Sequence, residues 1–262
     1  MINYTPIHEL VHIGSFHVYS WGFMLVLGFI IAGLLFFRQA NKKRLSHEYI
    51  LNVLLMLLLG TIIGGRLFYV LEHFSYYSSH LLDILAFGQG GETSYGGILL
   101  GLVFLWLYNK FSKYKGKLSF SELLDLIAPY VVLGACISRI GCFLNWDDFG
   151  IQSTLPWAIQ TIGDVARHPT QLYESFYLLI IFSVLLVFRK IKENPSGEQT
   201  RFKMLLEKKG SLFLIFVLFY SFLRFFNDFL RVYDNYFLGL ALSQWICIAL
   251  FISGIFILWK KK

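Results

Sequence analysis

The sequence has few charged residues for its length. Only 15% of the 262 residues are charged and 56% are hydrophobic, whereas about a quarter of a typical soluble domain is charged. Long uncharged runs such as residues 18–37 could not all be buried in one small core. The composition therefore excludes an ordinary water-soluble globule and predicts an all-α polytopic membrane protein.

Cysteine is also scarce, and each of the three cysteines lies in an apolar stretch. Cys136, Cys142 and Cys247 form neither a C-x-x-C pair nor a Cys/His ligand spacing. This pattern argues against a disulfide framework and a zinc site, and it favours small buried side chains. We expect no metal and no cofactor. The first fifteen residues lack the basic region of a signal peptide, so we expect the first apolar run to stay in the protein.

About seven segments are apolar enough to cross a membrane, which requires about 20 mostly apolar residues. They are residues 19–37, 49–70, 95–111, 123–144, 173–188, 212–230 and 237–259. We expect a single transmembrane domain over residues 1–262. Its longer connections are an interfacial arm outside the membrane at 72–94, an outer loop at 145–172 and a cytoplasmic loop at 189–210.

The formal net charge of +7 would suggest nucleic-acid binding in a soluble chain, but its distribution indicates membrane topology. Eighteen of the 23 lysines and arginines follow the first, third and fifth segments or close the chain. Every second connection is therefore basic, as the positive-inside rule requires of one consistent orientation. We predict an outside N-terminus, a cytoplasmic C-terminus and no nucleic-acid partner.

The other five cations are all arginines, within apolar segments or near their outer ends. They are Arg66, Arg139, Arg167, Arg224 and Arg231. An uncompensated charge there costs about 2.5–3.5 kcal/mol on insertion scales. Because guanidinium groups bind phosphate bidentately, the set indicates an anionic ligand such as a phospholipid head group. Alternatively, some of these arginines only pair with carboxylates to fix helix packing. The possible partners are Glu72, Asp147, Asp148, Glu174 and Asp228.

Other polar side chains accompany these arginines. In the sixth segment Tyr220, Arg224 and Asp228 recur every four residues, which places them on one helix face. The outer ends of the fourth and fifth segments add Asn145, Asp147, Gly150, His168 and Gln171. His168 is a candidate base, although a histidine that only packs the loop is at least as consistent with its position.

A glycine-rich stretch at residues 88–97 superficially suggests a phosphate-binding loop. No Gly-Lys-Ser/Thr follows it, and the predicted topology places it outside, away from ATP. The spacing of Gly97 and Gly101 instead predicts close helix packing. Tyr95 begins the same helix and offers a hydroxyl among glycines that leave room for a ligand.

Taken together, these motifs resemble those of the prolipoprotein diacylglyceryl transferase family, the membrane enzymes that lipidate bacterial prelipoproteins. The resemblance covers nearly the whole chain, in the blocks 20–22, 64–70, 94–97, 139–145, 167–174 and 220–231. The most specific blocks are Arg-Ile-Gly at 139–141 and His-Pro-Thr-Gln-Leu-Tyr-Glu at 168–174. The family is seven-helical with an outside N-terminus, in agreement with the charge distribution.

The resemblance implies transfer of the diacylglyceryl group of phosphatidylglycerol to the lipobox cysteine thiol in the signal peptide of a prelipoprotein, with release of glycerol phosphate. It implies an enzyme of the bacterial cytoplasmic (inner) membrane, with its active site toward the outer face, and we expect a monomer. By position, Arg139 matches the family's phosphatidylglycerol-binding arginine and Arg224 its second essential arginine. The predicted catalytic residues are Arg139, Arg224, Tyr95 and Asp147. The predicted substrate-binding residues are Arg139, Arg66, Asn145, Gly150, His168, Gln171, Tyr220, Asp228 and Arg231.

Some positions depart from the common family pattern. Tyr95 replaces a histidine proposed as the base, Cys142 an asparagine, Trp146 a glycine, Asp147 a glutamate and Trp21 a tyrosine. A tyrosine with a pKa of about 10 is a poor base at neutral pH, so the identity of the base stays open. Two alternatives remain: a diverged member that binds anionic phospholipid or lipoprotein without catalysis, and an anion transporter, although no internal repeat supports the latter.

Overall fold

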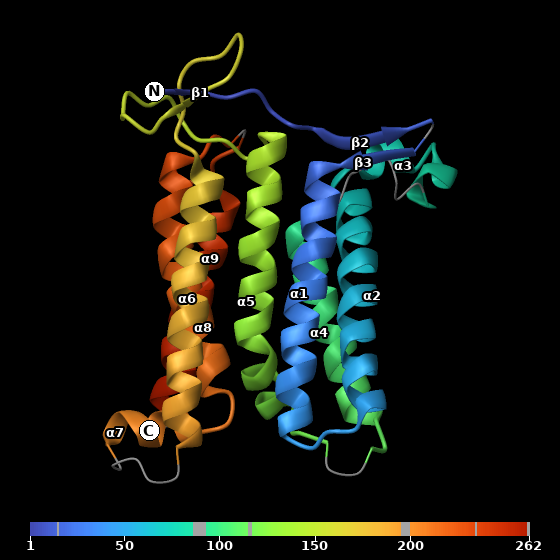
Figure 1. The fold of residues 1–262 in the computed structure, drawn as a ribbon, viewed down its shortest axis with the longest axis vertical. Coiled ribbons are helices and arrows are strands. Elements are labelled where there is room, and N and C mark those ends of the chain that lie inside the picture. Colours follow the sequence, from blue (N-terminus) through green and yellow to red (C-terminus); the bar gives the residue numbers. More distant parts are fainter. Residues whose placement is uncertain (15, 86–92, 115–116, 195–199, 234, 261–262) are drawn as a thin grey trace. The chain divides into compact units, whose positions relative to one another are not determined.

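The computed structural model describes residues 1–14, 16–85, 93–114, 117–194, 200–233 and 235–260 (Figure 1). It divides into two compact units, each described by itself: unit 1 contains residues 1–36 and 124–262, and unit 2 contains residues 37–123. Residues 88–92, the first half of the glycine-rich stretch rejected as a phosphate loop, lie outside the described residues.

Helices occupy each of the apolar segments expected from the sequence. Among the described residues, six helices are long and apolar enough to cross a membrane: α1 (Ser20–Lys42), α2 (His47–Glu72), α5 (Phe120–Asn145), α6 (Thr170–Glu193), α8 (Ser211–Asn227, continued by the 3-10 turn η3, Asp228–Leu230) and α9 (Leu242–Lys260). A shorter apolar helix, α4 (Ser94–Phe111), occupies the remaining segment. The all-α polytopic membrane fold is therefore confirmed, whereas the count of seven crossings and the orientation stay predictions.

Two local features differ from the sequence-based expectation. The last segment is predicted to begin at residue 237, but α9 begins at Leu242 because Leu238 and Gly239 have left-handed φ angles of 50° and 78°. Short strands, which apolar periodicity does not predict, lie outside the long helices. β1 (Ile2–Asn3) pairs in parallel with β4 (Ile159–Gln160), and β2 (Glu9–Ile13) is antiparallel to β3 (Phe16–Tyr19).

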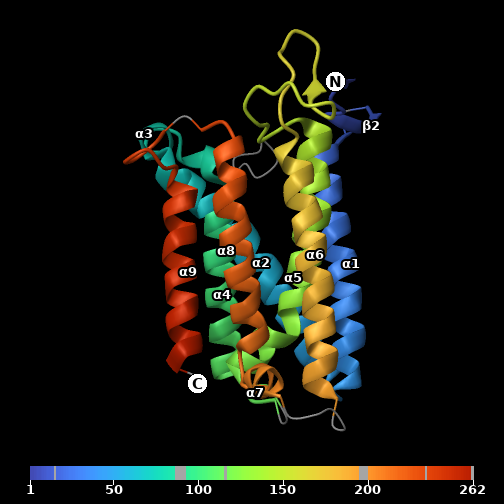
Figure 2. The ribbon, with the colours of Figure 1, turned by 90° about the vertical axis from the view of Figure 1, so that its left-hand side faces the viewer.

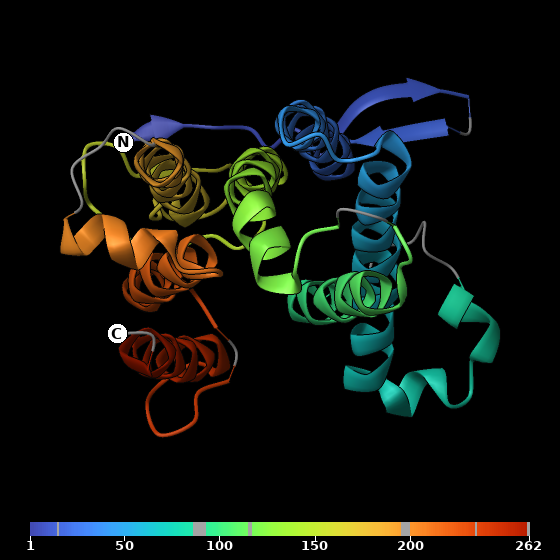
Figure 3. The same ribbon diagram turned by 90° about the horizontal axis from the view of Figure 1, so that it is seen from below.

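Unit 1 is built around α5, α6, α8 and α9, and α8 lies between α6 and α9 (Figure 3). Its buried apolar core includes Leu178, Leu185 and Ile215. Helices α5 and α6 are joined where Cys136 Sγ donates to the Ser175 carbonyl (3.2 Å) and Ser175 Oγ donates to the Cys136 carbonyl (2.9 Å). All three cysteines are free and buried, as the sequence predicted.

The N-terminus and the short helix α7 (Arg201–Glu207) lie at opposite ends of unit 1 (Figure 2). At one end, the N-terminal segment joins the end of α5, where the Ile7 amide and the Tyr4 hydroxyl donate to the Leu144 carbonyl at 2.8 and 3.0 Å. At the other end, near α7, Lys192 Nζ lies 2.8 Å from Asp125 Oδ2. The outer loop and the basic cytoplasmic loop predicted from the sequence thus lie at opposite ends.

Unit 2 consists mainly of α2 and α4, which pack closely through glycines. A Cβ atom on Gly60 would lie 2.7 Å from Gly101 Cα, and one on Gly64 would overlap the Gly96 carbonyl oxygen. A Cβ on Gly97 would lie 3.0 Å from the Thr61 carbonyl oxygen. The close helix packing predicted for Gly97 and Gly101 is therefore confirmed.

The described part of the arm predicted at residues 72–94 contains α3 (Phe74–Tyr77) and the 3-10 turn η1 (Leu81–Leu85). Leu81, Leu82 and Leu85 are strongly exposed in η1. Exposed leucines suit a segment that rests in the membrane interface, which stays a prediction for this arm.

Candidate active site

Three arginines of unit 1 converge from separate elements. Arg139 is in the second-last turn of α5, Arg224 is in the last turn of α8, and Arg231 directly follows η3. With Glu174 near the start of α6, and with Asp148 and Asp228, they form a group of six side chains that we call the arginine cluster. The sequence predicted an anionic ligand for a set of five arginines, and unit 1 brings three of them together.

Glu174 lies at the centre of the arginine cluster and is almost fully buried, with its side chain 1% exposed. Its Oε2 lies 3.1 Å from Arg139 Nε and 3.5 Å from Arg231 Nη1, and it also accepts from Arg224 Nη1. The Tyr220 hydroxyl donates to Oε1 at 3.4 Å. A buried carboxylate normally needs opposite charge close by, and three guanidinium groups supply it here.

Asp228 is the second carboxylate of the arginine cluster. Its Oδ1 lies 2.8 Å from Arg224 Nε and accepts from the Tyr233 hydroxyl at 2.7 Å. Burial raises the pKa of Tyr233 to about 12, even though the nearby charge of Arg224 lowers it. The phenol therefore stays protonated at neutral pH and remains a hydrogen-bond donor to Asp228.

Asp148 is the third carboxylate, and it bridges two arginines. Its Oδ2 lies 2.9 Å from Arg139 Nη1 and its Oδ1 lies 2.5 Å from Arg231 Nη2. Burial raises the pKa of Asp148, but Arg231 and Arg139 together lower it more, so the pKa lies below its ordinary value and the group is anionic. Three arginines thus face three carboxylates, and the arginine cluster is neutral overall.

These ion pairs agree with the alternative that the arginines pair with carboxylates to fix helix packing. The arginine cluster is nevertheless accessible to a ligand. Arg139 keeps 18% of its side chain exposed, and Asp148 keeps 43%. Among the described residues, the buried Arg231 Nε has no hydrogen-bond partner. The arginine cluster therefore has an accessible edge at Arg139 and Asp148, and an unused donor beside it.

Asp147 does not belong to the arginine cluster. It is the last member of a separate series of hydrogen-bonded polar side chains. Its carboxylate accepts from Asn145 Nδ2, and Asn145 Oδ1 pairs with His8 Nδ1 at 2.9 Å. Gln171 Nε2 donates to the Asp147 carbonyl, and its buried Oε1 has no partner among the described residues. Burial raises the pKa of Asp147, which makes it a stronger base than an ordinary aspartate.

Gly150 and His168 lie together in the outer loop. The Gly150 amide donates to the His168 carbonyl at 3.0 Å, and a Cβ on Gly150 would lie 2.6 Å from that oxygen. His168 Nδ1 pairs with the Tyr173 hydroxyl at 3.3 Å, and burial lowers the pKa of His168. Close backbone packing accounts for both residues, and their predicted contact with substrate stays a prediction.

Arg167 is held away from the arginine cluster by its own partner. Its Nε and Nη2 lie 2.6 and 2.9 Å from the two carboxylate oxygens of Asp164. Its guanidinium carbon also lies 4.8 Å from the centre of the Phe149 ring. Arg167, one of the five arginines that the sequence singles out, therefore belongs to the outer loop and not to the arginine cluster.

Arg66 and Tyr95 belong to unit 2. The Arg66 side chain is buried and donates to the carbonyls of Asp83 and Ile84, the latter at 3.0 Å, so it fixes η1. Its guanidinium carbon also lies 5.4 Å from the centre of the Tyr77 ring. Tyr95, in the first turn of α4, is 43% exposed. Their predicted roles in binding and catalysis stay predictions.

Sequence reasoning missed three members of this site as functional residues: Glu174, Asp148 and Tyr233. From the sequence, Glu174 and Asp148 were predicted only as carboxylates that could pair with an arginine, and neither was predicted to act in binding or catalysis. The available signal was the scarcity of acids in apolar segments, since a carboxylate costs energy there unless an arginine faces it. Tyr233 lies in a connection without a clear pattern, so only the fold brings it to Asp228.

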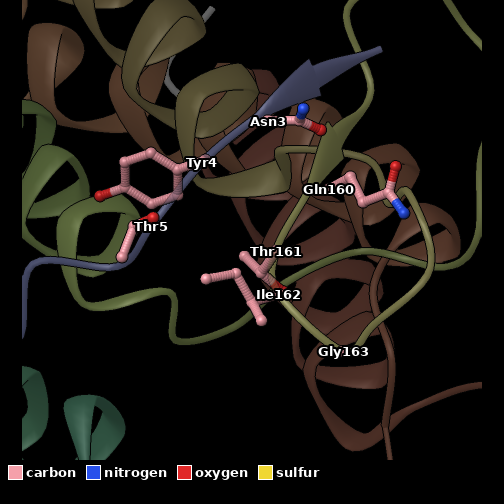
Figure 4. Close-up of a pocket in the computed structure, with 7 residues that line it drawn as sticks. All are labelled: Asn3, Tyr4, Thr5, Gln160, Thr161, Ile162 and Gly163. Atoms are coloured by element: carbon pink, nitrogen blue, oxygen red, sulfur yellow. The ribbon is translucent and has the colours of Figure 1, made fainter.

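A pocket of about 380 Å³ lies where β1 meets β4 (Figure 4). It is lined by Asn3, Tyr4, Thr5, Gln160, Thr161, Ile162 and Gly163. None of these belongs to the arginine cluster, and none is charged. The accessible edge of the arginine cluster therefore remains the better candidate for an anionic ligand.

Comparison with known proteins agrees with the family resemblance of the motifs. Residues 8–260 match the family model described as prolipoprotein diacylglyceryl transferase. The phosphatidylglycerol–prolipoprotein diacylglyceryl transferase of Finegoldia magna is 34% identical over 242 residues, which cover 92% of this chain and 90% of that relative. The enzyme of the same name from Streptococcus uberis is 31% identical over 260 residues, covering 96% and 94% of the two chains. The chain belongs to the prolipoprotein diacylglyceryl transferase family.

Proposed function

We propose that this chain transfers the diacylglyceryl group of phosphatidylglycerol to the lipobox cysteine thiol of a prelipoprotein, releasing glycerol phosphate. Family membership supports a transferase with these substrates, since the relatives are named for both. The observation in the structure that carries the proposal is the arginine cluster with its accessible edge at Arg139. No other site among the described residues gathers three arginines.

The reaction needs cations for the leaving phosphate. The cysteine sulfur forms a bond to the glyceryl carbon that carries the phosphate, the carbon–oxygen bond breaks, and its electron pair leaves on the phosphate oxygen. Arg139, at the accessible edge, would bind the phosphate, and Arg224 would stabilise the charge that develops on it. Arg231 would share the phosphate with Arg139, since both contact the Asp148 carboxylate. Tyr220, through Glu174, and Asp228, through Arg224, would hold the guanidinium groups in place.

The thiol proton needs a base, because the thiolate is the nucleophile. Asp147 is our first candidate, since its carboxylate is outside the arginine cluster and burial raises its pKa. Asn145 and Gln171 would orient it, through the carboxylate and the backbone carbonyl respectively. Tyr95 remains a second candidate.

The charge distribution supports a location at the outer face of the bacterial inner membrane. The ends of α5 and α8 carry the arginine cluster, and the N-terminal segment contacts the same end of α5. With the N-terminus outside, as the positive-inside rule predicts, the arginine cluster would face outward. We expect the protein to act as a monomer.

The proposal is tested with purified protein in phosphatidylglycerol vesicles and two peptides that differ only in a lipobox cysteine or serine. The expected result is a lipidated cysteine peptide and an unchanged serine peptide. If both peptides bound without modification, the non-catalytic alternative would replace the proposal. Flux of an anion across the vesicle wall without lipidation would support a transporter instead.

A further inference from the structure

The three carboxylates of the arginine cluster differ in exposure. The side chains of Glu174 and Asp228 are 1% and 0% exposed, whereas that of Asp148 is 43% exposed. Asp148 also lies in the loop after α5, whereas Glu174 and Asp228 lie within helical turns. Of the three, Asp148 alone could leave the arginine cluster without a helix moving.

The loop holds Asp148 in an unusual backbone conformation. Its φ angle is 59°, in the left-handed region that residues other than glycine rarely adopt, and Trp146 has a φ of 60°. Thr170 Oγ1 donates to the Asp148 carbonyl at 2.8 Å, and Gln171 Nε2 donates to the neighbouring Asp147 carbonyl. The start of α6 thus fixes the backbone that directs the Asp148 carboxylate toward two arginines.

The contacts of Asp148 resemble those of a bound phosphate. Each of its two oxygens lies on a different guanidinium group, Oδ2 on Arg139 and Oδ1 on Arg231. The two non-bridging oxygens of a phosphate ester bind arginines in the same manner. Because the arginine cluster is already neutral, a phosphate that entered without displacing a carboxylate would leave it with excess negative charge.

We infer that Asp148 is an exchangeable occupant of the phosphate site: the phosphate of the substrate lipid displaces its carboxylate from Arg139 and Arg231, and the carboxylate returns to displace the glycerol phosphate product. The inference rests on the proposed function and adds a role for a residue outside the predicted site. The exchange breaks and forms ion pairs only. Asp148 therefore limits the affinity of the site for phosphate and promotes product release.

The test compares wild type with Asp148→Asn, which removes the charge at nearly constant size, and with Asp148→Glu, which keeps it. Asp164→Asn is the matched control, because Asp164 is a half-buried aspartate of the same loop that pairs with Arg167, outside the arginine cluster. Three quantities are measured on purified protein: the Kd of glycerol phosphate by calorimetry, and kcat and KM for phosphatidylglycerol in vesicles.

Asp148→Asn is expected to bind glycerol phosphate on the order of tenfold more tightly than wild type. This corresponds to about the free energy of one charged hydrogen bond, which the phosphate gains when no carboxylate competes for the arginines. Its KM for phosphatidylglycerol should fall, and its kcat should fall as well because product leaves slowly. Asp164→Asn should stay near wild type in all three quantities, and Asp148→Glu, which keeps the competing carboxylate, should not show the tighter binding of Asp148→Asn. A purely structural role for Asp148 would instead raise KM or leave Kd unchanged.

Unchanged or weaker glycerol phosphate binding by Asp148→Asn would overturn the inference. So would a failure of Asp148→Asn to fold while Asp148→Glu folds, because the carboxylate would then serve as a structural ion-pair partner. The proposed function fails separately, if wild type transfers nothing from phosphatidylglycerol. The calorimetric comparison does not depend on turnover, so the two failures are distinguishable.

Discussion

At the scale of single residues, the guanidinium groups of the arginine cluster carry the proposed chemistry. Arg139→Ala and Arg224→Ala should each lower the rate of transfer at least about 100-fold, because each removes a donor aimed at the leaving phosphate. Arg139→Lys keeps the charge but loses the planar fork, so it should recover only part of the activity. The measurement is release of glycerol phosphate from phosphatidylglycerol vesicles.

Arg189 provides the control for these substitutions. It lies in α6, where its Nη1 donates to the Tyr130 hydroxyl at 2.6 Å, and it does not belong to the arginine cluster. Arg189→Ala should therefore keep most of the activity. Equal losses in Arg189→Ala and Arg139→Ala would show a general effect of losing arginine and would count against a specific phosphate site.

Substitution of Glu174 is expected to lower the stability of the protein, in addition to any effect on the reaction. Its carboxylate is buried between three arginines, and removing one partner of a buried ion pair costs about 3–5 kcal/mol because the remaining charges stay uncompensated. Glu174→Gln should thus lower the thermal midpoint in detergent strongly. Asp164→Asn, which breaks a more exposed pair, should lower it less. A midpoint of Glu174→Gln equal to that of wild type would refute the assigned position of Glu174.

The raised pKa of Asp147 predicts the acid side of the pH–rate profile. Burial raises this pKa, and only the deprotonated form accepts the thiol proton, so activity should fall as pH drops through a value above about 3.9, the ordinary aspartate pKa. Asp147→Asn should abolish this acid limb together with most of the rate. A full rate in Asp147→Asn would exclude Asp147 as the base and leave Tyr95, whose test is the profile of Tyr95→Phe.

Asp148 should contribute little to that acid limb. Its pKa lies below the unfolded value, because Arg231 and Arg139 outweigh the effect of burial. The stability that its charge provides is therefore complete above about pH 4 and is lost only as pH falls through the lower folded pKa.

At the scale of helices, the contact between α2 and α4 depends on glycine. A Cβ on Gly64 would overlap the Gly96 carbonyl oxygen and lie 2.7 Å from Leu100 Cβ. Gly64→Val should therefore separate α2 from α4 and lower the thermal midpoint of the protein. Gly22→Ala in α1 is the control, since no atom lies within 4 Å of the added Cβ. Similar midpoints for the two variants would contradict the close packing.

The helices themselves could be predicted from the sequence, because apolar length decides where a chain can cross a membrane. The start of α9 could not, since the left-handed residues Leu238 and Gly239 end the apolar run locally without changing its hydrophobicity. Strands β1 and β4 pair across more than 150 residues, and each is only two residues long. No local pattern specifies such a contact.

The arginines of the candidate site could be predicted from the sequence, whereas its carboxylates could be predicted less well. Arg139, Arg224 and Arg231 are conspicuous because a charge in an apolar segment needs a reason. Glu174 and Asp148 are as important to the observed geometry, yet which acid faces which arginine depends on how α5, α6 and α8 pack. Asp147 illustrates the same limit, since its contacts with Asn145 and Gln171 come from a loop and a separate helix.

At the scale of the whole molecule, the net charge of +7 separates into two populations with different roles. Eighteen cations lie in the clusters that predict topology, and five arginines lie elsewhere. Of these five, Arg139, Arg224 and Arg231 share the arginine cluster, Arg167 pairs with Asp164, and Arg66 fixes η1. The cations relevant to the proposed reaction are thus three of 23.

The central claim is that the arginine cluster serves diacylglyceryl transfer from phosphatidylglycerol to a cysteine thiol. The most direct measurement counts lipidated lipobox peptide and glycerol phosphate in the same reaction, with purified wild-type protein in vesicles of phosphatidylglycerol or of phosphatidylcholine. We predict equal amounts of the two products with phosphatidylglycerol, and neither product with phosphatidylcholine or with Arg139→Ala. Lipidation without glycerol phosphate, or the same yield from Arg139→Ala, would contradict the account.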